Sequence, residues 1–131
     1  MAAFKRFEEI NAWKKGRSIT NNIFQVIQNS ELRKNFALKD QLIRCSISIT
    51  ANIAEGFERN SNKEFCYFLA IAKGSTGELR SFLYVLLDNQ FIGESDFKQL
   101  YQESLEISAM LSKLIHYLSN SPFKGPRHKK P

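Results

Sequence analysis

Residues 38–57 carry two apolar rows at helical spacing, and this pattern strongly limits the folds open to the chain. The first row alternates steps of three and four residues and consists of Leu38, Leu42, Cys45, Ile49, Asn52 or Ile53, and Gly56. The second row consists of Ile43, Ile47, Thr50 and Ala54. A helix that is apolar on two sides needs packing partners on both sides, so a one-sided surface helix is excluded. The pattern therefore predicts a core helix of a multi-helix fold.

The segment IRCSISITANI also invites interpretation as a β-strand, because β-branched and polar residues alternate from Cys45 to Thr50. We reject a strand here for two reasons. The spacing of three and four residues persists for several turns on either side, and a lone strand would have no partner to pair with. The segment is therefore predicted to be helical.

Similar spacing elsewhere predicts four helices, over about residues 7–29, 34–58, 62–89 and 95–119. Ser61 followed by Glu64 forms a capping box that starts the third helix. Gly93 is expected to form the C-terminal turn of that helix, and Ser95 to cap the last helix. Long helices with short connections predict an all-α fold, an antiparallel up-down-up-down four-helix bundle, in a single domain over residues 1–119.

Small residues interrupt the third helix in the segment AKGSTGEL. The segment superficially resembles a phosphate-binding loop, but it lacks the GxxxxGK[ST] pattern and does not follow a strand. Glycine within a helix costs about 1 kcal/mol relative to alanine, so it usually marks a close approach. We therefore expect another backbone or a bulky side chain to lie near Gly77.

The chain carries no apolar run of the length that a membrane span needs, and MAAFKRFEEI lacks the apolar core of a signal peptide. We expect a cytoplasmic protein without a membrane partner. Cys45 and Cys66 match neither a CxxC pair nor a disulfide framework, so buried free thiols are predicted.

The net charge of +6 is unevenly distributed along the 131 residues. Residues 1–63 carry 11 basic and 6 acidic side chains, whereas residues 64–119 carry 4 and 7. Residues 120–131 carry 4 basic side chains, no acidic one and all three prolines, which predicts a flexible basic tail. This tail is either a solubilising terminus or an electrostatic arm for nucleic acid or anionic surfaces.

No catalytic or metal-binding constellation is visible in the sequence. The two histidines, His116 and His128, lack a second ligand three or four residues away, and no HExxH or Cys/His cluster is present. We therefore expect no catalytic residue, no metal and no cofactor, and we predict that the protein is not an enzyme.

A polar stripe on the second helix consists of Arg44, Ser48, Glu55 and Arg59. Arg44 and Glu55 share a face but lie roughly 16 Å apart, too far to pair. Glu55 can reach Arg59 four residues on, and Arg44 can reach Glu78 on the third helix. We interpret the stripe as structural ion pairs within the bundle or at a subunit contact, and the alternative is a ligand groove.

Three segments resemble a known family: the helix around Trp13, LKDQLIRCSISITANIAEGFER from Leu38 to Arg59, and FCYFLAIAKGSTGEL from Phe65 to Leu79. The chain resembles the bacterial four-helix-bundle proteins encoded within 23S rRNA intervening sequences, which are related to the accessory variability protein of diversity-generating retroelements. The resemblance covers about residues 4–119 and leaves the basic tail outside.

The resemblance implies a homopentamer of four-helix bundles without known enzymatic activity. In the retroelement relatives, a basic surface is associated with binding of nucleic acid and of a reverse transcriptase. The positions that match the family pattern, which we assign to packing and assembly, are Gln41, Arg44, Ser48, Asn52, Glu55, Gly56, Gly74, Ser75 and Glu78.

Two functions follow as hypotheses. The first is a non-enzymatic oligomer that binds RNA or DNA through phosphate contacts. The predicted contact residues are Lys5, Arg6, Lys14, Lys15, Arg17, Lys34 and Lys39, together with Lys124, Arg127, Lys129 and Lys130 in the tail. The second is a structural or adaptor oligomer that recognises a protein partner through an exposed helix face. The net acidity of residues 64–119 predicts that any nucleic-acid contact is confined to one surface.

Overall fold

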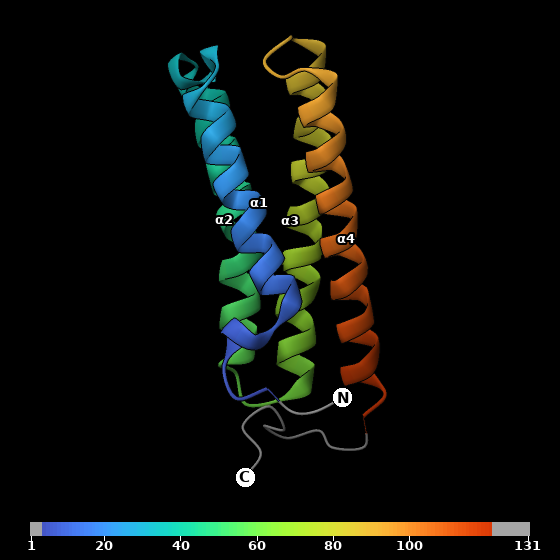
Figure 1. The fold of residues 1–131 in the computed structure, drawn as a ribbon. Helices are drawn as coiled ribbons and strands as arrows, with labels where there is room; N and C mark the ends of the chain where they lie inside the picture. Colours follow the sequence, from blue (N-terminus) through green and yellow to red (C-terminus); the bar gives the residue numbers. More distant parts are fainter. Residues whose placement is uncertain (1–3, 122–131) are drawn as a thin grey trace.

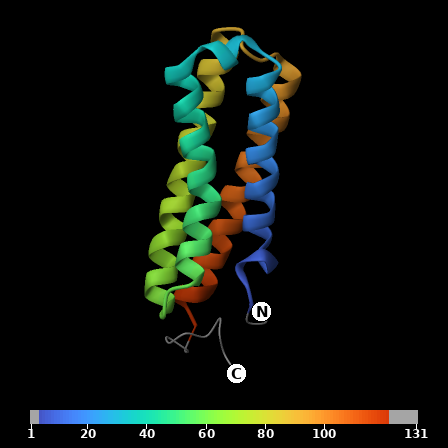
Figure 2. The ribbon, with the colours of Figure 1, turned by 90° about the vertical axis from the view of Figure 1, so that its left-hand side faces the viewer.

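The fold was analysed in a computed structural model, in which residues 4–121 are described. The α-helices of this part of the chain are α1 (Asn11–Gln28), α2 (Phe36–Phe57), α3 (Asn62–Asp88) and α4 (Glu94–Ser119). Two short 3-10 turns, η1 (Phe7–Glu9) and η2 (Glu31–Lys34), precede α1 and α2. Successive helices run in opposite directions (Figures 1 and 2), so the predicted all-α up-down-up-down bundle is confirmed.

The two ends of the bundle differ in what they contain. The start of α1, the turn between α2 and α3 and the end of α4 lie at one end (Figure 1). η2 and the turn between α3 and α4 lie at the other end (Figure 2). We call these the N-terminal end and the η2 end of the bundle.

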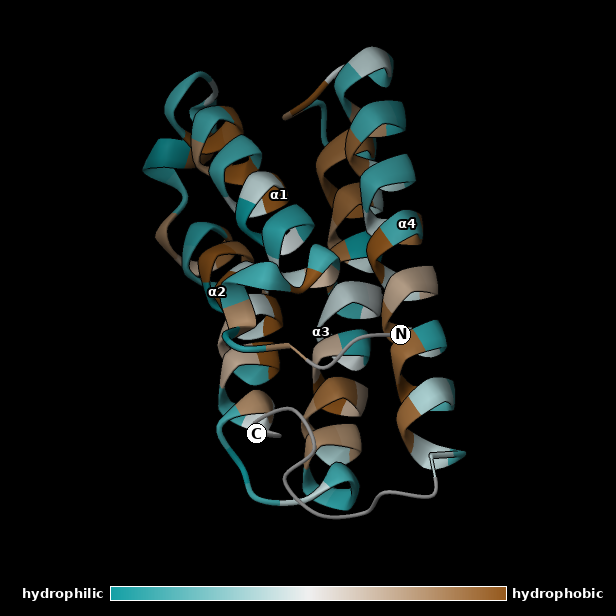
Figure 3. Cartoon of the chain, turned by 60° about the horizontal axis from the view of Figure 1, so that its bottom comes forward, coloured by the Kyte–Doolittle hydropathy of each residue, from teal (hydrophilic) through white to brown (hydrophobic). Residues whose placement is uncertain are grey.

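The core runs along the bundle between the four helices. Figure 3 shows hydrophobic stretches on sides of the helices that face one another. Within α2 the buried apolar side chains include Leu42, Cys45, Ile49 and Ile53, all members of the first predicted row. The alternating segment around Cys45 to Thr50 lies wholly within α2, which confirms that it is helical.

The helix starts follow local capping chemistry. The Ser61 hydroxyl accepts a hydrogen bond of 3.2 Å from the Glu64 backbone N–H, as the predicted capping box requires. Asn35 caps α2 in a similar way, because its side-chain oxygen accepts from the Leu38 N–H at 3.1 Å. The helix expected to begin near residue 7 begins instead at Asn11, after extended backbone at Ile10.

The turn between α3 and α4 differs from the prediction. The left-handed position after α3 is taken by Gln90, with φ of 61°, and not by Gly93. The Phe91 N–H then donates to the Leu86 carbonyl at 2.8 Å and closes the end of α3. Gly93 is the N-cap of α4 with extended backbone, so Ser95 is not the cap.

Two glycines allow helices to approach each other closely. A Cβ on Gly16 in α1 would lie 2.9 Å from Thr50 Cγ2, and a Cβ on Gly56 in α2 would lie 2.7 Å from Phe68 Cβ. Gly77 does not play this role: the atom that its Cβ would meet within 4 Å is Nη2 of Arg80, three residues further along the same helix, at 3.8 Å. The expectation of a close approach at Gly77 is therefore wrong within the described residues.

Candidate functional site

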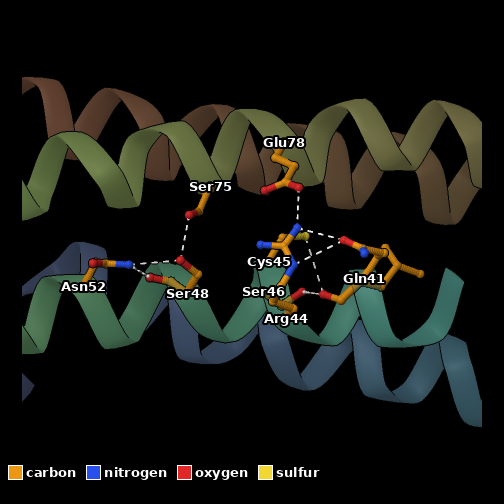
Figure 4. A network of polar contacts seen from close by, with 9 residues as sticks. Gln41, Arg44, Cys45, Ser46, Ser48, Asn52, Ser75 and Glu78 are labelled. Carbon is orange, nitrogen blue, oxygen red and sulfur yellow. Dashed lines mark hydrogen bonds and ion pairs between the residues drawn. The ribbon is translucent and has the colours of Figure 1, made fainter. Parts of the chain in front are cut away.

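Polar side chains of α2 and α3 form a row along the outside of the bundle, in two separate groups of contacts. We call it the α2–α3 polar row, and its members are Gln41, Arg44, Ser48, Asn52, Ser75 and Glu78 (Figure 4). Arg44 forms an ion pair with Glu78 across the two helices. Its guanidinium also donates to the Gln41 side-chain oxygen, from Nη2 at 2.9 Å and from Nε at 3.2 Å. The predicted Arg44–Glu78 pair is confirmed.

The second half of the row is built from hydroxyls and an amide. The hydroxyls of Ser48 and Ser75 lie 2.8 Å apart, although Ser75 is only 8% exposed. Asn52 donates from Nδ2 to the Ser48 carbonyl at 2.8 Å and to the Ser48 hydroxyl at 2.9 Å. Each member therefore has a partner within the row, and the row joins α2 to α3 (Figure 4).

Beyond the row, Arg59 forms ion pairs with two neighbouring acidic side chains. It pairs with Glu55 at 3.0 Å, as predicted, and with Glu64 at 3.6 Å. Its guanidinium also lies over the Phe68 ring, 4.8 Å from the ring centroid. These groups are partly exposed, so each pair contributes about 0–1 kcal/mol. The predicted stripe is thus a set of internal contacts.

Apolar side chains remain exposed beside the polar row. Ile47 on α2 is 45% exposed and Tyr67 on α3 is 63% exposed. Tyr67, Ile71, Gly74, Glu78 and Val85 fall within about 60° around α3 at 100° per residue. A Cβ on Gly74 would meet no atom within 4 Å. We call the surface formed by Ile47, Tyr67, Ile71, Gly74 and Val85 the α2–α3 outer face.

The predicted basic residues divide between the two ends of the bundle. Lys5 and Arg6 precede η1, and Lys14, Lys15 and Arg17 lie in the first half of α1, toward the N-terminal end. Lys34 and Lys39 lie at the η2 end. The tail residues Lys124, Arg127, Lys129 and Lys130 lie outside the described residues, which end at Ser121, after α4, at the N-terminal end.

Several of these basic side chains already have partners. Lys15 pairs with Glu106 of α4 at 2.7 Å, a hydrogen bond that raises the Lys15 pKa and lowers the Glu106 pKa. Lys34 pairs with Glu31 at 3.4 Å, and the Lys39 ammonium lies 4.7 Å from the centroid of the Phe36 ring. Among the described residues, no ion pair involves Lys5, Arg6, Lys14 or Arg17.

Sequence reasoning missed an aromatic cluster between α3 and α4. Tyr84 of α3 lies against Phe97 and Tyr101 of α4, with ring centroids 5.0 and 5.9 Å away. The spacing of four residues between Phe97 and Tyr101 was the available signal. Their contact with Tyr84 depends on the register of α3 against α4, which the sequence does not disclose.

The described residues offer little for acid–base, nucleophilic or metal chemistry. Between residues 4 and 121, no group of three His, Cys, Asp or Glu side chains could hold a metal ion. Both cysteines are free, and burial raises the pKa of the Cys45 thiol to about 12, which suppresses its thiolate at neutral pH. Cys66 is half-buried rather than fully buried as predicted.

Two open cavities of about 260 Å³ each also lack a catalytic pair. The cavity at the η2 end is lined mainly by amides and apolar side chains, with Asp96 as its one carboxylate. The other lies at the N-terminal end and includes Asn62, Lys63 and Cys66. None of the helices from α1 to α4 combines the length and apolar character needed to cross a bilayer.

The fold and these surfaces define an all-α helical-bundle protein whose polar side chains bridge neighbouring helices on the outside of the bundle. The chain belongs to the 23S rRNA-intervening sequence protein family, whose model matches residues 8–113. No curated protein matches the chain.

A solved structure is also similar to the chain. It is the crystal structure, at 1.70 Å resolution, of a protein of unknown function from the S23 ribosomal protein family of Bacteroides thetaiotaomicron VPI-5482. The TM-score is 0.72 at 25% sequence identity, and the match covers 79% of this chain and 97% of that chain.

Proposed function

We propose that the protein is a non-enzymatic homo-oligomer that binds RNA or DNA through the basic surface at its N-terminal end. The observation that carries the proposal is the charge on α1: this helix contains Lys14, Lys15 and Arg17 and no acidic residue. Only Lys15 is matched by an acidic side chain of another described helix. Unpaired surface cations of this kind suit phosphate contacts, which need no particular base sequence.

Two further features support a nucleic-acid contact at this end. Lys5 and Arg6 are exposed beside the start of α1, and the chain leaves the described residues at Ser121 at the same end. Four more basic residues follow Ser121 in the sequence. By contrast, Lys34 lies at the other end and is already paired with Glu31. An aromatic contact does not distinguish the two ends, because Lys39 lies over the Phe36 ring and Arg17 over the Trp13 ring.

The oligomeric part of the proposal is supported by the α2–α3 outer face. Exposed Tyr67 and Ile71 share a face of α3 with Gly74, beside which a second backbone could approach, and Ile47 is exposed on α2. Such an apolar area, rimmed by the satisfied polar row, has the composition of a subunit contact. The expected number of five subunits rests on the family resemblance.

The nucleic-acid contact can be tested by fluorescence anisotropy of a labelled single-stranded oligonucleotide over a salt series. Binding should weaken steeply with salt, and Lys5→Gln/Lys14→Gln should reduce the slope of log K against log salt by about two. Lys34→Gln/Lys39→Gln removes the same charge at the η2 end and is the matched control, with an unchanged slope. Absence of binding at low salt, or binding insensitive to salt, contradicts the proposal.

The assembly surface is tested separately by light scattering. Ile71→Lys on the α2–α3 outer face should lower the solution mass of the oligomer, because it buries an unpaired charge in the contact. Leu105→Lys on α4 is the control, since Leu105 and Ile71 are similarly exposed. A monomeric wild-type chain would contradict the oligomer, and loss of assembly only with Leu105→Lys would place the contact elsewhere.

The adaptor hypothesis depends on the same α2–α3 outer face. A protein partner, for example a reverse transcriptase as the family resemblance suggests, would occupy the exposed Tyr67 and Ile71. An oligomer that binds no oligonucleotide in the salt series would favour this function over the first.

A further inference from the structure

We propose that the outer surface between α3 and α4 is a stacking site for an unpaired nucleotide. In this site Tyr84, supported by Phe97 and Tyr101, stacks on a base, and Arg80 binds the adjoining phosphate. The proposal rests on the nucleic-acid binding proposed above and adds the class of substrate, single-stranded rather than duplex. It assigns a second contact region, away from the basic residues of α1.

The three rings form a supported platform. Phe97 and Tyr101 stack with their centroids 5.5 Å apart and an interplanar angle of 29°, and Tyr84 meets Phe97 at 62° and Tyr101 at 81°. Tyr84 is nevertheless 49% exposed. The Tyr101 side chain, whose ring centroid lies 5.9 Å from that of Tyr84, raises the pKa of the Tyr84 hydroxyl. The exposed ring is held in place and suits stacking against a base.

Arg80 supplies the second, independent observation. It lies four residues before Tyr84 on α3 and is half-buried. Its Nη1 atom is fully buried and has no hydrogen-bond partner among the described residues. No acidic side chain between residues 4 and 121 forms an ion pair with it. Leaving this one nitrogen buried without an acceptor is costly, and the guanidinium is geometrically matched to a phosphate. A phosphate that drew the half-buried side chain outward would give Nη1 the acceptor that it lacks.

The surroundings of Arg80 leave room for such a phosphate. Gly77 lies on the same side of α3, and a Cβ there would meet only Arg80 Nη2, at 3.8 Å, among atoms within 4 Å. A side chain at this position would narrow the approach to the guanidinium. Gly77 brings no other helix close, and its role in this proposal is to leave the Arg80 guanidinium open to a phosphate.

Charge along α3 gives the bound strand a direction. Lys73, Gly77, Arg80 and Tyr84 fall within about 60° around the helix, and seven residues place Lys73 about 10 Å from Arg80 along the axis. Glu78 is turned away to Arg44 on α2. Asp88 and Glu94 lie toward the turn beyond Tyr84. Phosphates are therefore expected to run from Arg80 toward Lys73 and away from the acidic turn.

A strand of nucleic acid fits this arrangement better than a second copy of the chain. An exposed ring beside two cations on one helix face matches a base followed by successive phosphates. A protein partner would need an acidic side chain for Arg80 and a further one for Lys73. The test below includes the subunit contact as an outcome.

The test compares two probes with the full chain: an oligoadenylate strand and an abasic strand with the same number of phosphates. The wild-type chain should bind oligoadenylate about tenfold more tightly. Tyr84→Ala should remove this preference and leave abasic binding unchanged, whereas Tyr84→Phe, which keeps the ring, should retain most of the preference. Arg80→Gln should weaken binding of both strands. Phe36→Ala, which removes an exposed aromatic side chain at the start of α2, is the matched control and should change neither affinity.

The possible results distinguish failure of the stacking site from failure of the proposed nucleic-acid binding. Binding of both strands with equal affinity, at unchanged salt dependence, overturns the stacking site and leaves the α1 contact intact. Failure of both strands to bind at low salt overturns the proposed function together with the stacking site. A reduced oligomer mass for Tyr84→Ala without any base preference in the wild type would make this surface a subunit contact, which also overturns the inference. Thermal melting of Tyr84→Phe and Tyr84→Ala verifies that both variants fold.

Discussion

Helix α3 presents two outer faces, one beside α2 and one beside α4. The two faces differ in whether their arginine side chains have hydrogen-bond partners. Beside α2, the Arg44 guanidinium is held by Glu78 and Gln41, and every member of the α2–α3 polar row has a partner. Beside α4, a buried nitrogen of Arg80 has no hydrogen-bond partner within the described chain. Satisfied polar groups join helices, whereas a buried guanidinium nitrogen without a partner marks a place where a ligand or a water molecule can bind. The contrast suggests that the first face serves structure and the second serves binding.

The largest expected effect concerns the glycines on the α2–α3 side. Gly56→Ala should lower the free energy of unfolding by about 2–3 kcal/mol, because the new Cβ would lie 2.7 Å from Phe68 Cβ and 3.2 Å from the Phe65 carbonyl oxygen. Backbone at Phe65 cannot move without shifting α3. Urea unfolding at fixed protein concentration measures the change.

Gly74→Ala is the matched control for that substitution. Its Cβ meets no atom within 4 Å, so better helix propensity should raise the free energy of unfolding by about 0.5–1 kcal/mol. If Gly56→Ala and Gly74→Ala lowered the free energy of unfolding equally, the close packing of Gly56 against α3 would not be the cause of the loss. A Gly74→Ala variant with a stable fold and a lower oligomer mass would sharpen the assignment of the outer face to assembly.

An intermediate effect is expected from the hydroxyl pair within the polar row. Ser75→Ala removes the partner of the Ser48 hydroxyl in a buried position and should lower the free energy of unfolding by about 1 kcal/mol. Ser81→Ala, an exposed position on the same helix, is the comparison and should be nearly neutral. A neutral Ser75→Ala would mean that the row contributes little to the joining of α2 and α3.

The sequence predicted the helices and the contacts on the α2 side, because these depend on local spacing. Glu55 reaches Arg59 four residues on along the chain, and the first apolar row of α2 is buried as its spacing predicted. The second row is not covered throughout, because Ile47 stays 45% exposed. The α4 side was not predictable in the same way. Its register follows from the turn after α3, where Gln90 adopts the left-handed conformation that was expected of Gly93. Because the sequence does not give this register, it could not predict the contact between Tyr84 and Tyr101. Nor could it predict that a buried nitrogen of Arg80 lacks a partner.

The smallest expected effect is also the most discriminating one, because the two faces should respond with opposite signs. Arg80→Met should raise the free energy of unfolding by up to about 1 kcal/mol, since methionine keeps much of the apolar stem and removes a buried donor that lacks an acceptor. Arg44→Met should lower it by up to about 1 kcal/mol, because it breaks a partly exposed ion pair and leaves Glu78 and Gln41 without their donor. Binding should move in the reverse order: oligoadenylate affinity should fall for Arg80→Met and stay unchanged for Arg44→Met. If Arg80→Met destabilised the fold as Arg44→Met does, the Arg80 guanidinium would have a structural role, and the two faces of α3 would not differ in kind. A more stable variant that binds less tightly is instead the pattern expected when a residue is kept for its ligand at a cost to the fold.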